Sequence, residues 1–308
     1  MKRMELEGGI TVGTFNPPPK GFDPFTASAA ELEDHGFPAL PSDAHHLARY
    51  RRVFGHITHK LNYVEPTFRV NRDRVHGPRS RRPTDTTETS GNWSGGVVYA
   101  PAGQSFRWVE GDWIVPDVDA PTQNQWYYCA SWIGIDGDGS PDVFQAGVEC
   151  EVFRSGSSIT RHIYPWWEWY PAPEVQITNL GVSPGDLITM LLCSTAAAGS
   201  TTGVVFITNR TTGVSTSVQL SAPANTKLVG NSAEWIVEAP TVGGAQSAIA
   251  DYGEDFFTVC EAVTNKGAVV NGASGNKINL AVGGRTVSAG VLVTPTIVQC
   301  LYEGGLPA

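Results

Sequence analysis

The residues best suited to chemistry in the later part of this 308-residue chain are glutamines, glutamates and tryptophans. They gather in three short segments, GNWSGGVVY, SWIGIDGDGSPDVFQAGVE and SAEWIVEAP, and His162 is the one histidine after residue 90. A Ser-His-Asp triad, a Cys-His dyad and an HExxH zinc site each need a well-placed imidazole. If this chain is an enzyme, we therefore expect its proton chemistry to run on a carboxyl group.

The elements that must position these residues are predicted to be β-strands. Runs such as SFRWVEGDWIVP, VFQAGVECEVF and DLITMLLCST are rich in Val, Ile, Thr and aromatic residues, and Gly, Pro, Asn and Ser clusters separate them at hairpin spacing. A helical period occurs only before residue 90, around ASAAELEDHG and DAHHLARYRRVF. The pattern predicts an all-β fold, a large antiparallel β-sandwich of the concanavalin-like or jelly-roll type, with a partly helical N-terminal segment.

Charge divides the chain into two parts. Residues 1–90 hold 13 of the 21 Lys and Arg residues and 11 of the 30 Asp and Glu residues, which leaves 8 basic and 19 acidic residues after position 90. Six of the seven histidines also lie in the first part. We therefore predict an N-terminal leader, residues 1–88, followed by one catalytic β-sandwich domain, the body, residues 89–308.

Two interpretations of the leader remain open. Its basic run RVNRDRVHGPRSRRPTDTTETS is typical of a solvated tail, but also of an inhibitory prosegment joined to an acidic body by a cleavable linker. The second interpretation predicts release in acid, when body carboxylates lose charge and leader histidines gain it, with cleavage within RSRRPTDTTETS. Nucleic acid is not an expected partner, because the acidic body would repel phosphate.

Further features limit the function. We expect no membrane span, because no stretch approaches about 18 apolar residues, and the N-terminus shows no evident signal peptide. The five widely spaced cysteines indicate mostly buried thiols, with one disulfide left open: Cys129, Cys150, Cys193, Cys260 and Cys300. The alternation of Asp136, Asp138, Ser140 and Asp142 resembles the start of a calcium loop, but Pro141 and Gly147 replace its required glycine and glutamate, so a hairpin loop is favoured.

The order of six motifs resembles that of the glutamic peptidases, the eqolisin family of acid endopeptidases. The motifs are NWSGG, WIGIDGD, FQAG, WWEWYP, AEWIVE and ADYG, and they span essentially all of residues 91–308. The resemblance implies two bent antiparallel sheets with a concave substrate cleft, and a catalytic pair of glutamine and glutamate. By motif position these are Gln145 and Glu238, the second acid of AEWIVE, rather than Glu234. It also suggests secretion and substrates that are polypeptides in extended conformation; we expect no cofactor, no metal and a monomer.

The pair makes chemical sense for amide hydrolysis. The reaction needs a base for water, an acid for the leaving amine and a donor for the oxyanion. Glu238 could serve as base and then as acid, and its apolar strand neighbours would raise its pKa. Gln145 offers a neutral NH2 donor at any pH. The alternatives are a solvent-facing strand glutamate and a rim amide.

The supporting residues are expected on the motif strands. Four tryptophans would either form the bottom of the cleft or belong to the core: Trp93, Trp132, Trp166 and Trp169. Glu168 and Tyr170 share one face of a strand, where the resemblance implies that Glu168 tunes the catalytic acid and Tyr170 contacts substrate; a charged strand edge is the alternative. Asp136 would support the Gln145 side or simply shape a turn.

The rival function is a carbohydrate-binding or glycoside-hydrolysing sandwich. Retaining glycosidases place two carboxyl groups about 5–5.5 Å apart, and Glu168 with Glu238 could form such a pair. Gln145, an amide, would then have no role.

Overall fold

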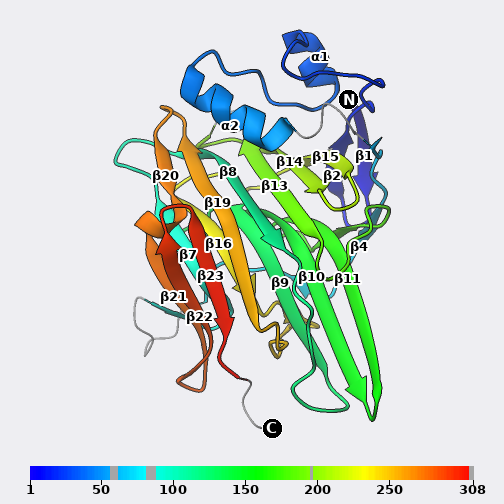
Figure 1. Cartoon of the computed structure of the whole chain (residues 1–308), viewed down its shortest axis with the longest axis vertical. Helices are drawn as coiled ribbons and strands as arrows, with labels where there is room; N and C mark the ends of the chain where they lie inside the picture. The colour runs from blue at the N-terminus through cyan, green and yellow to red at the C-terminus, as the bar shows by residue number, and fades with distance from the viewer. Residues whose placement is uncertain (56–61, 81–87, 195–196, 305–308) are drawn as a thin grey trace.

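The computed structural model describes residues 1–55, 62–80, 88–194 and 197–304. Within these ranges the chain is mostly β, with two large antiparallel sheets that curl toward each other and two α-helices near the N-terminus (Figure 1). The expected β-sandwich and both expected helical segments are thus confirmed.

The first sheet, called sheet 1, carries all the motif strands of the sequence. Its strands lie in the following order, each antiparallel to the next: β4 (Phe68–Val70), β12 (Val175–Ile177), β11 (Ser158–Trp169), β10 (Phe144–Ser155), β9 (Trp126–Ile135), β16 (Ser232–Glu238), β7 (Trp93–Tyr99) and β21 (Asn276–Val282).

The second sheet, called sheet 2, continues from β21. Its order is β1 (Lys2–Leu6), β2 (Ile10–Thr14), β15 (Val214–Ser221), β14 (Thr202–Asn209), β13 (Leu187–Ser194), β8 (Phe106–Ile114), β19 (Glu254–Thr264), β23 (Ile297–Tyr302), β22 (Arg285–Thr294) and β21. Because β21 pairs with both β7 and β22, the two sheets are continuous at this edge.

Short elements complete the fold. β3 (Asn62–Tyr63) runs parallel to β15, β6 (Thr89–Ser90) runs parallel to β21, and β20 (Val269–Asn271) pairs with β19 before the 3-10 helix η1 (Gly272–Ser274). A small third sheet consists of β5 (Arg74–Val75), β17 (Thr241–Val242) and β18 (Ala245–Gln246).

The main core lies between the two sheets. Side chains alternate across each strand, so in β16 Trp235 and Val237 enter the core while the intervening residues face the other way. Trp235 also donates from its indole N–H to the backbone oxygen of Glu110 on β8, at 2.8 Å, which ties the sheets together. Each such large apolar side chain contributes about 1.5–3 kcal/mol of burial free energy.

The described part of the leader is folded onto the body. The β1–β2 hairpin extends sheet 2 by pairing with β15. Helix α1 (Ala29–Asp34) begins with a capping box between Ser28 and Glu31, and α2 (Ala44–Phe54) begins at Asp43. Figure 1 shows both helices at one end of the molecule, near β8 and β13. These residues of the leader are therefore packed on the body rather than solvated.

Helix α2 is held by apolar packing and by buried ion pairs. Tyr50 and Phe54 pack in one cluster with Trp108 and Phe206 of the body. Arg49 and Arg52 of the helix both pair with Glu110 and Glu261 of the body. Burial raises the pKa of Glu110 to about 7 despite the two arginines. Burial acts the same way on Glu261, but Arg52 and Arg49 outweigh it and lower the pKa of that carboxyl.

The five cysteines are free thiols, and four of them are buried. In the described parts of the chain, no helix is long and apolar enough to cross a bilayer.

Candidate active site

The candidate site lies on the face of sheet 1 that is turned away from the main core. Alternation along β10 puts Gln145 and Glu149 on this face, and alternation along β11 adds Trp166 and Glu168. Glu238 ends β16. The carboxyl and amide side chains here are at most 1% exposed, so their charges are governed by contacts within the site.

A segment of the leader crosses this face. Its strand β5 pairs with β17, and the next residue, His76, is fully buried against the site. The His76 N–H donates to both carboxylate oxygens of Glu168, at 3.2 and 3.1 Å. Its carbonyl oxygen accepts from Gln145 Nε2 at 2.5 Å. The backbone of one leader residue thus bridges Gln145 and Glu168.

The His76 imidazole binds two further carboxylates. Nδ1 lies 3.2 Å from Glu238 Oε2, and Nε2 lies 2.9 Å from Glu174 Oε2. The ring stacks on Trp166 with centroids 3.8 Å apart and 5° between the planes. Burial alone would lower the pKa of His76, but the hydrogen bonds to Glu174 and Glu238 outweigh it and raise that pKa well above its usual value. These contacts therefore favour the protonated form of the imidazole.

Glu238 has the richest set of donors in the site. Trp132 Nε1 donates to its Oε2 at 2.9 Å, and Asn92 Nδ2 donates to its Oε1 at 3.2 Å. Burial raises the pKa of Glu238, while the donors from His76, Asn92 and Trp132 oppose that rise. The carboxyl is thus held in a fixed orientation by donors that favour its ionised form, while burial favours its protonated form.

Strand register alone would not select Glu238 over Glu234. Glu234 pairs with Gly134, which pairs with Gln145, so these three residues form one row across the sheet. The Trp132 ring, however, lies over Gly134, where an added Cβ would meet it at 2.8 Å. Trp132 therefore fills the space between Glu234 and Gln145, and His76 contacts Glu238 instead.

Other carboxyl groups make this face strongly acidic. Burial raises the pKa of Glu149 to about 8, although Arg74 and His76 oppose the rise. Burial also raises the pKa of Glu168 well above its usual value. Arg74 and His76 of the leader thus lie among closely packed carboxyl groups, two of which burial makes harder to ionise.

The segment is anchored on both sides of His76. Upstream, Arg74 Nη1 donates to Glu151 Oε1 at 2.8 Å and the guanidinium lies 4.7 Å from the centre of the Tyr128 ring. Downstream, Arg79 Nη1 donates to Asp138 Oδ2 at 2.9 Å. Asn92 Nδ2 also donates to the carbonyl oxygens of residues 77 and 78, at 3.3 and 3.2 Å. Residues 74–79 are therefore held across the site in a defined register.

Of the remaining residues predicted for the site, some lie beside the leader segment and others support the fold. Trp93 packs edge-on against Trp132, and a Cβ on Gly77 would lie 3.6 Å from the ring of Tyr170, so both lie beside the segment. Trp169 belongs to the core between the sheets. Asp136 accepts three backbone N–H groups, from residues 229, 230 and 231, at 2.7–2.9 Å. These bonds make Asp136 the support of a loop.

The loop that resembled a calcium site uses its acids for other contacts. Asp138 binds Arg79 and the Tyr99 hydroxyl, and Asp142 accepts from Trp169 Nε1 at 3.2 Å.

A second group of residues, His76, Glu149 and Glu174, lies close enough together to hold a cation. In a tetrahedral zinc site each ligand atom lies about 2.0–2.2 Å from the metal, so two ligand atoms are farther apart than 2.9 Å. The direct 2.9 Å bond between His76 and Glu174 therefore does not have the spacing of two zinc ligands.

Four residues of the site were missed by sequence reasoning: His76, Asn92, Glu149 and Glu174. Two of them carried a usable signal. Glu149 follows Gln145 by four residues in one strand, so it had to share its face. Asn92 lies inside the motif NWSGG. His76 looked like one basic residue of a solvated linker.

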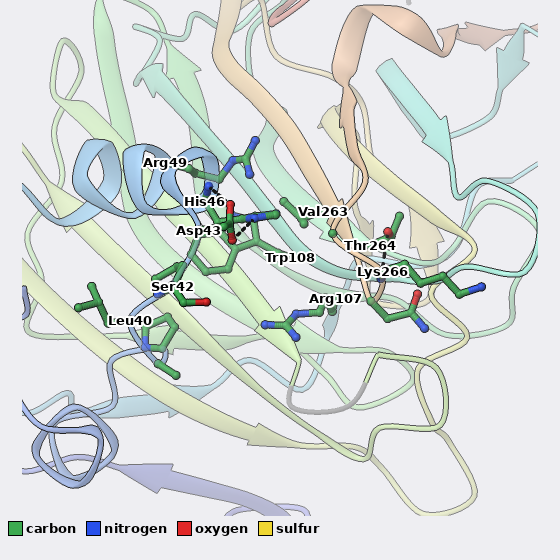
Figure 2. Close-up of a pocket in the computed structure, with 15 residues that line it drawn as sticks. Leu40, Ser42, Asp43, His46, Arg49, Arg107, Trp108, Val263, Thr264 and Lys266 are labelled. Carbon is green, nitrogen blue, oxygen red and sulfur yellow. Dashed lines mark hydrogen bonds and ion pairs between the residues drawn. The ribbon is translucent and has the colours of Figure 1, made fainter.

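Two cavities of the described chain lie outside the candidate site. One of about 510 Å³ is bounded by leader residues 38–43, 46 and 49, and by body residues 107, 108 and 263–267 (Figure 2). Another, of about 560 Å³, lies beside Arg74, Glu151 and Tyr164. Gln145 and Glu238 line neither cavity, because the leader segment covers them.

Comparison with known proteins gives one family. Residues 91–302 match the Peptidase A4 family. Aspergillopepsin-2 of Aspergillus niger is 30% identical over 205 residues, which cover 61% of this chain and 69% of that protein.

Solved structures agree in fold. A crystal structure of scytalido-glutamic peptidase with a peptide-based transition-state analogue has a TM-score of 0.57 at 24% identity, over 69% of this chain and 98% of that one. A structure of SCP-B, described as an eqolisin in complex with the tripeptide Ala-Ile-His, has a TM-score of 0.53 at 21% identity, over the same shares.

Proposed function

The chain belongs to the Peptidase A4 family of glutamic peptidases, which are peptide-bond hydrolases, and we propose that Glu238 and Gln145 carry out its reaction on polypeptides in extended conformation. The observation that carries the proposal is that both side chains contact the same residue of a bound peptide segment. Gln145 donates to the carbonyl oxygen of His76, and Glu238 lies against its side chain.

In the proposed reaction, Glu238 takes a proton from a water molecule whose oxygen attacks the substrate carbonyl carbon. Gln145 Nε2, placed as it is on the His76 carbonyl, donates to the resulting oxyanion. Among the described residues the Gln145 carbonyl oxygen is buried without a hydrogen-bond partner, so it can accept from the same water. Glu238 then returns its proton to the leaving nitrogen, and the C–N bond breaks.

This cycle needs Glu238 ionised at the start and protonated at the second step. A group with two such roles works best near its own pKa. An acidic optimum is expected because both roles fall to a carboxyl group, whose pKa burial raises against the donors His76, Asn92 and Trp132.

The leader, residues 1–88, is proposed to be a prosegment that covers this site. Two observations support it: residues 74–79 lie across the proposed catalytic pair, and the family match begins only at residue 91. The tripeptide bound to SCP-B ends in Ile-His, and the leader presents the similar pair Val75–His76.

The carbohydrate alternative is set aside because the chain belongs to a peptidase family. The oxygens of Glu168, its second proposed carboxylate, are bound to the His76 N–H and to Gln145. The test is to incubate the protein with denatured casein and with β-glucan between about pH 2 and pH 7. Acid-dependent release of peptides alone supports the proposal, and sugar release without peptide release would overturn it.

A further inference from the structure

We propose that the peptide bond between His76 and Gly77 is a self-cleavage site, at which the chain hydrolyses its own leader. The inference rests on the proposed roles of Gln145 and Glu238. It places the cut upstream of the Arg- and Thr-rich stretch that sequence reasoning favoured.

The contacts of Gln145 select this bond. Its Nε2 donates to the carbonyl oxygen of His76 at 2.5 Å, which is the position that an oxyanion donor must take relative to a scissile carbonyl. The next two carbonyls, of Gly77 and Pro78, are bound by Asn92. Asn92 also binds Glu238, and the His76 ring contacts the same carboxyl, so both members of the pair have contacts next to the His76–Gly77 bond.

Downstream backbone groups are bound to residues other than Gln145 and Glu238. The Arg79 N–H donates to the backbone oxygen of Gly137 at 3.0 Å, and the Ser80 N–H donates to Asn92 Oδ1 at 2.8 Å. Arg74 upstream and Arg79 downstream fix the segment in this register through Glu151 and Asp138. The rest of the stretch favoured by sequence, residues 81–87, lies outside the described residues.

The reaction is a hydrolysis with water as the co-reactant. Glu238 takes a proton from water, the water oxygen bonds to the His76 carbonyl carbon, and Gln145 stabilises the oxyanion. As the intermediate collapses, the bond from that carbon to the Gly77 nitrogen breaks and Glu238 passes its proton to the nitrogen. The products are residues 1–76 with a new carboxyl terminus and residues 77–308 with a new amino terminus.

One contact also explains how the intact chain persists before cleavage. His76 Nδ1 lies 3.2 Å from Glu238 Oε2, so the leader already occupies one oxygen of the proposed base. The ring must turn away from Glu238, Glu174 and its stacking partner Trp166 before water can enter. The bound leader is therefore both inhibitor and slow substrate.

The test is to acidify the purified full chain and measure product masses over time. We expect fragments 1–76 and 77–308, formed with a first-order rate that does not change over about a hundredfold range of protein concentration. The cleavage should be absent in Glu238→Gln. A first cut at any other bond, or a chain that stays intact while it cleaves added peptide, would overturn the inference and leave the proposed function standing. A chain that cleaves neither itself nor added peptide would overturn both.

A matched pair of substitutions at Gly77 tests the bond itself. A Cβ on Gly77 meets only the Tyr170 ring, at 3.6 Å, so Gly77→Ala should be cut like the natural chain. Gly77→Pro replaces the leaving N–H by a ring nitrogen and should remain uncut at this bond. Among the described residues the Gly77 N–H donates no hydrogen bond, so folding should survive, as circular dichroism can check. Equal cutting of the two variants after His76 would refute the assignment.

Discussion

Replacing His76 by alanine in the full chain should weaken the leader's hold on the active site. The substitution removes the imidazole contacts to Glu174 at 2.9 Å and Glu238 at 3.2 Å, and the stacking on Trp166. Truncating one partner of a buried, hydrogen-bonded charge pair costs about 2–5 kcal/mol. A loss of about 3 kcal/mol raises the equilibrium constant for an uncovered site about 150-fold. The backbone bonds of residue 76 and the arginine anchors remain, so the leader should still bind.

The assay is the initial rate of hydrolysis of a fluorogenic peptide at about pH 5, with mass spectrometry confirming that the chain is still intact. We expect His76→Ala to cleave the peptide at least tenfold faster than the unsubstituted chain. His35→Ala is the matched control, because the described contacts of the His35 ring are with Asn16 and Phe22, which both belong to the leader. An unchanged rate in His76→Ala, or an equal increase in both variants, would refute the inhibitory role of His76.

Three further outcomes are expected. First, Arg52 and Arg49 lower the pKa of Glu261 against the effect of burial. Glu261 therefore stabilises the bound leader when the pH is above 4.5, its usual pKa, and loses this effect as the pH falls through its lowered pKa. Glu261→Gln should make the release of the leader below about pH 4, measured by gel filtration, less steep. Second, EDTA should leave peptidase activity unchanged, and a loss restored by a divalent ion would show that the chemistry needs metal. Third, Asp136→Ala leaves three buried N–H groups without their acceptor and should cost about 3 kcal/mol or more of unfolding free energy; a change below about 0.5 kcal/mol in denaturant melts would contradict its role.

Acid release of the leader has a different physical basis from the one that charge counting suggested. The hydrogen bonds of His76 to Glu174 and Glu238 raise its pKa, so protonation of this imidazole favours the bound leader rather than its release. Glu110, with a pKa raised to about 7 by burial, becomes neutral as the pH falls, and this favours the bound leader. The release therefore depends on carboxyls with lowered pKa values, such as Glu261, and starts only below about pH 4.5.

The sequence predicted the body better than the leader for a physical reason. Alternating Val, Ile and aromatic residues in β10 and β16 specify strands and faces locally, so the sequence alone was enough to assign Gln145 and Glu238 to strands. The leader's strands are short, and β2 is placed by its pairing with β15, about 200 residues away in the chain. No local pattern encodes such a pairing.

The same limit explains the site residues that were missed. His76 lies in a run rich in arginine and proline, and its role depends on Glu174 and Glu238, which are 98 and 162 residues away. Asp136 has a φ of 74°, a strained backbone held by its three bonds to residues 229–231, and neither property is visible in the sequence. The excess positive charge of the leader and the acidic composition of the body were the only signals that the two parts would meet.

The central claim is tested most directly by comparing Glu238→Gln with Glu234→Gln in peptide hydrolysis. Both are buried glutamates of β16, which makes the second a matched control. To weaken leader inhibition equally, both substitutions are made in the His76→Ala chain, and rates are measured at about pH 5 while mass spectrometry shows that both chains are intact. Because Glu238 acts as base and acid, we predict a loss of about 10⁴-fold in kcat for Glu238→Gln, and less than about tenfold for Glu234→Gln, with both variants folded. Activity within about tenfold of the His76→Ala chain in Glu238→Gln, or equal losses in the two variants, would contradict the assignment.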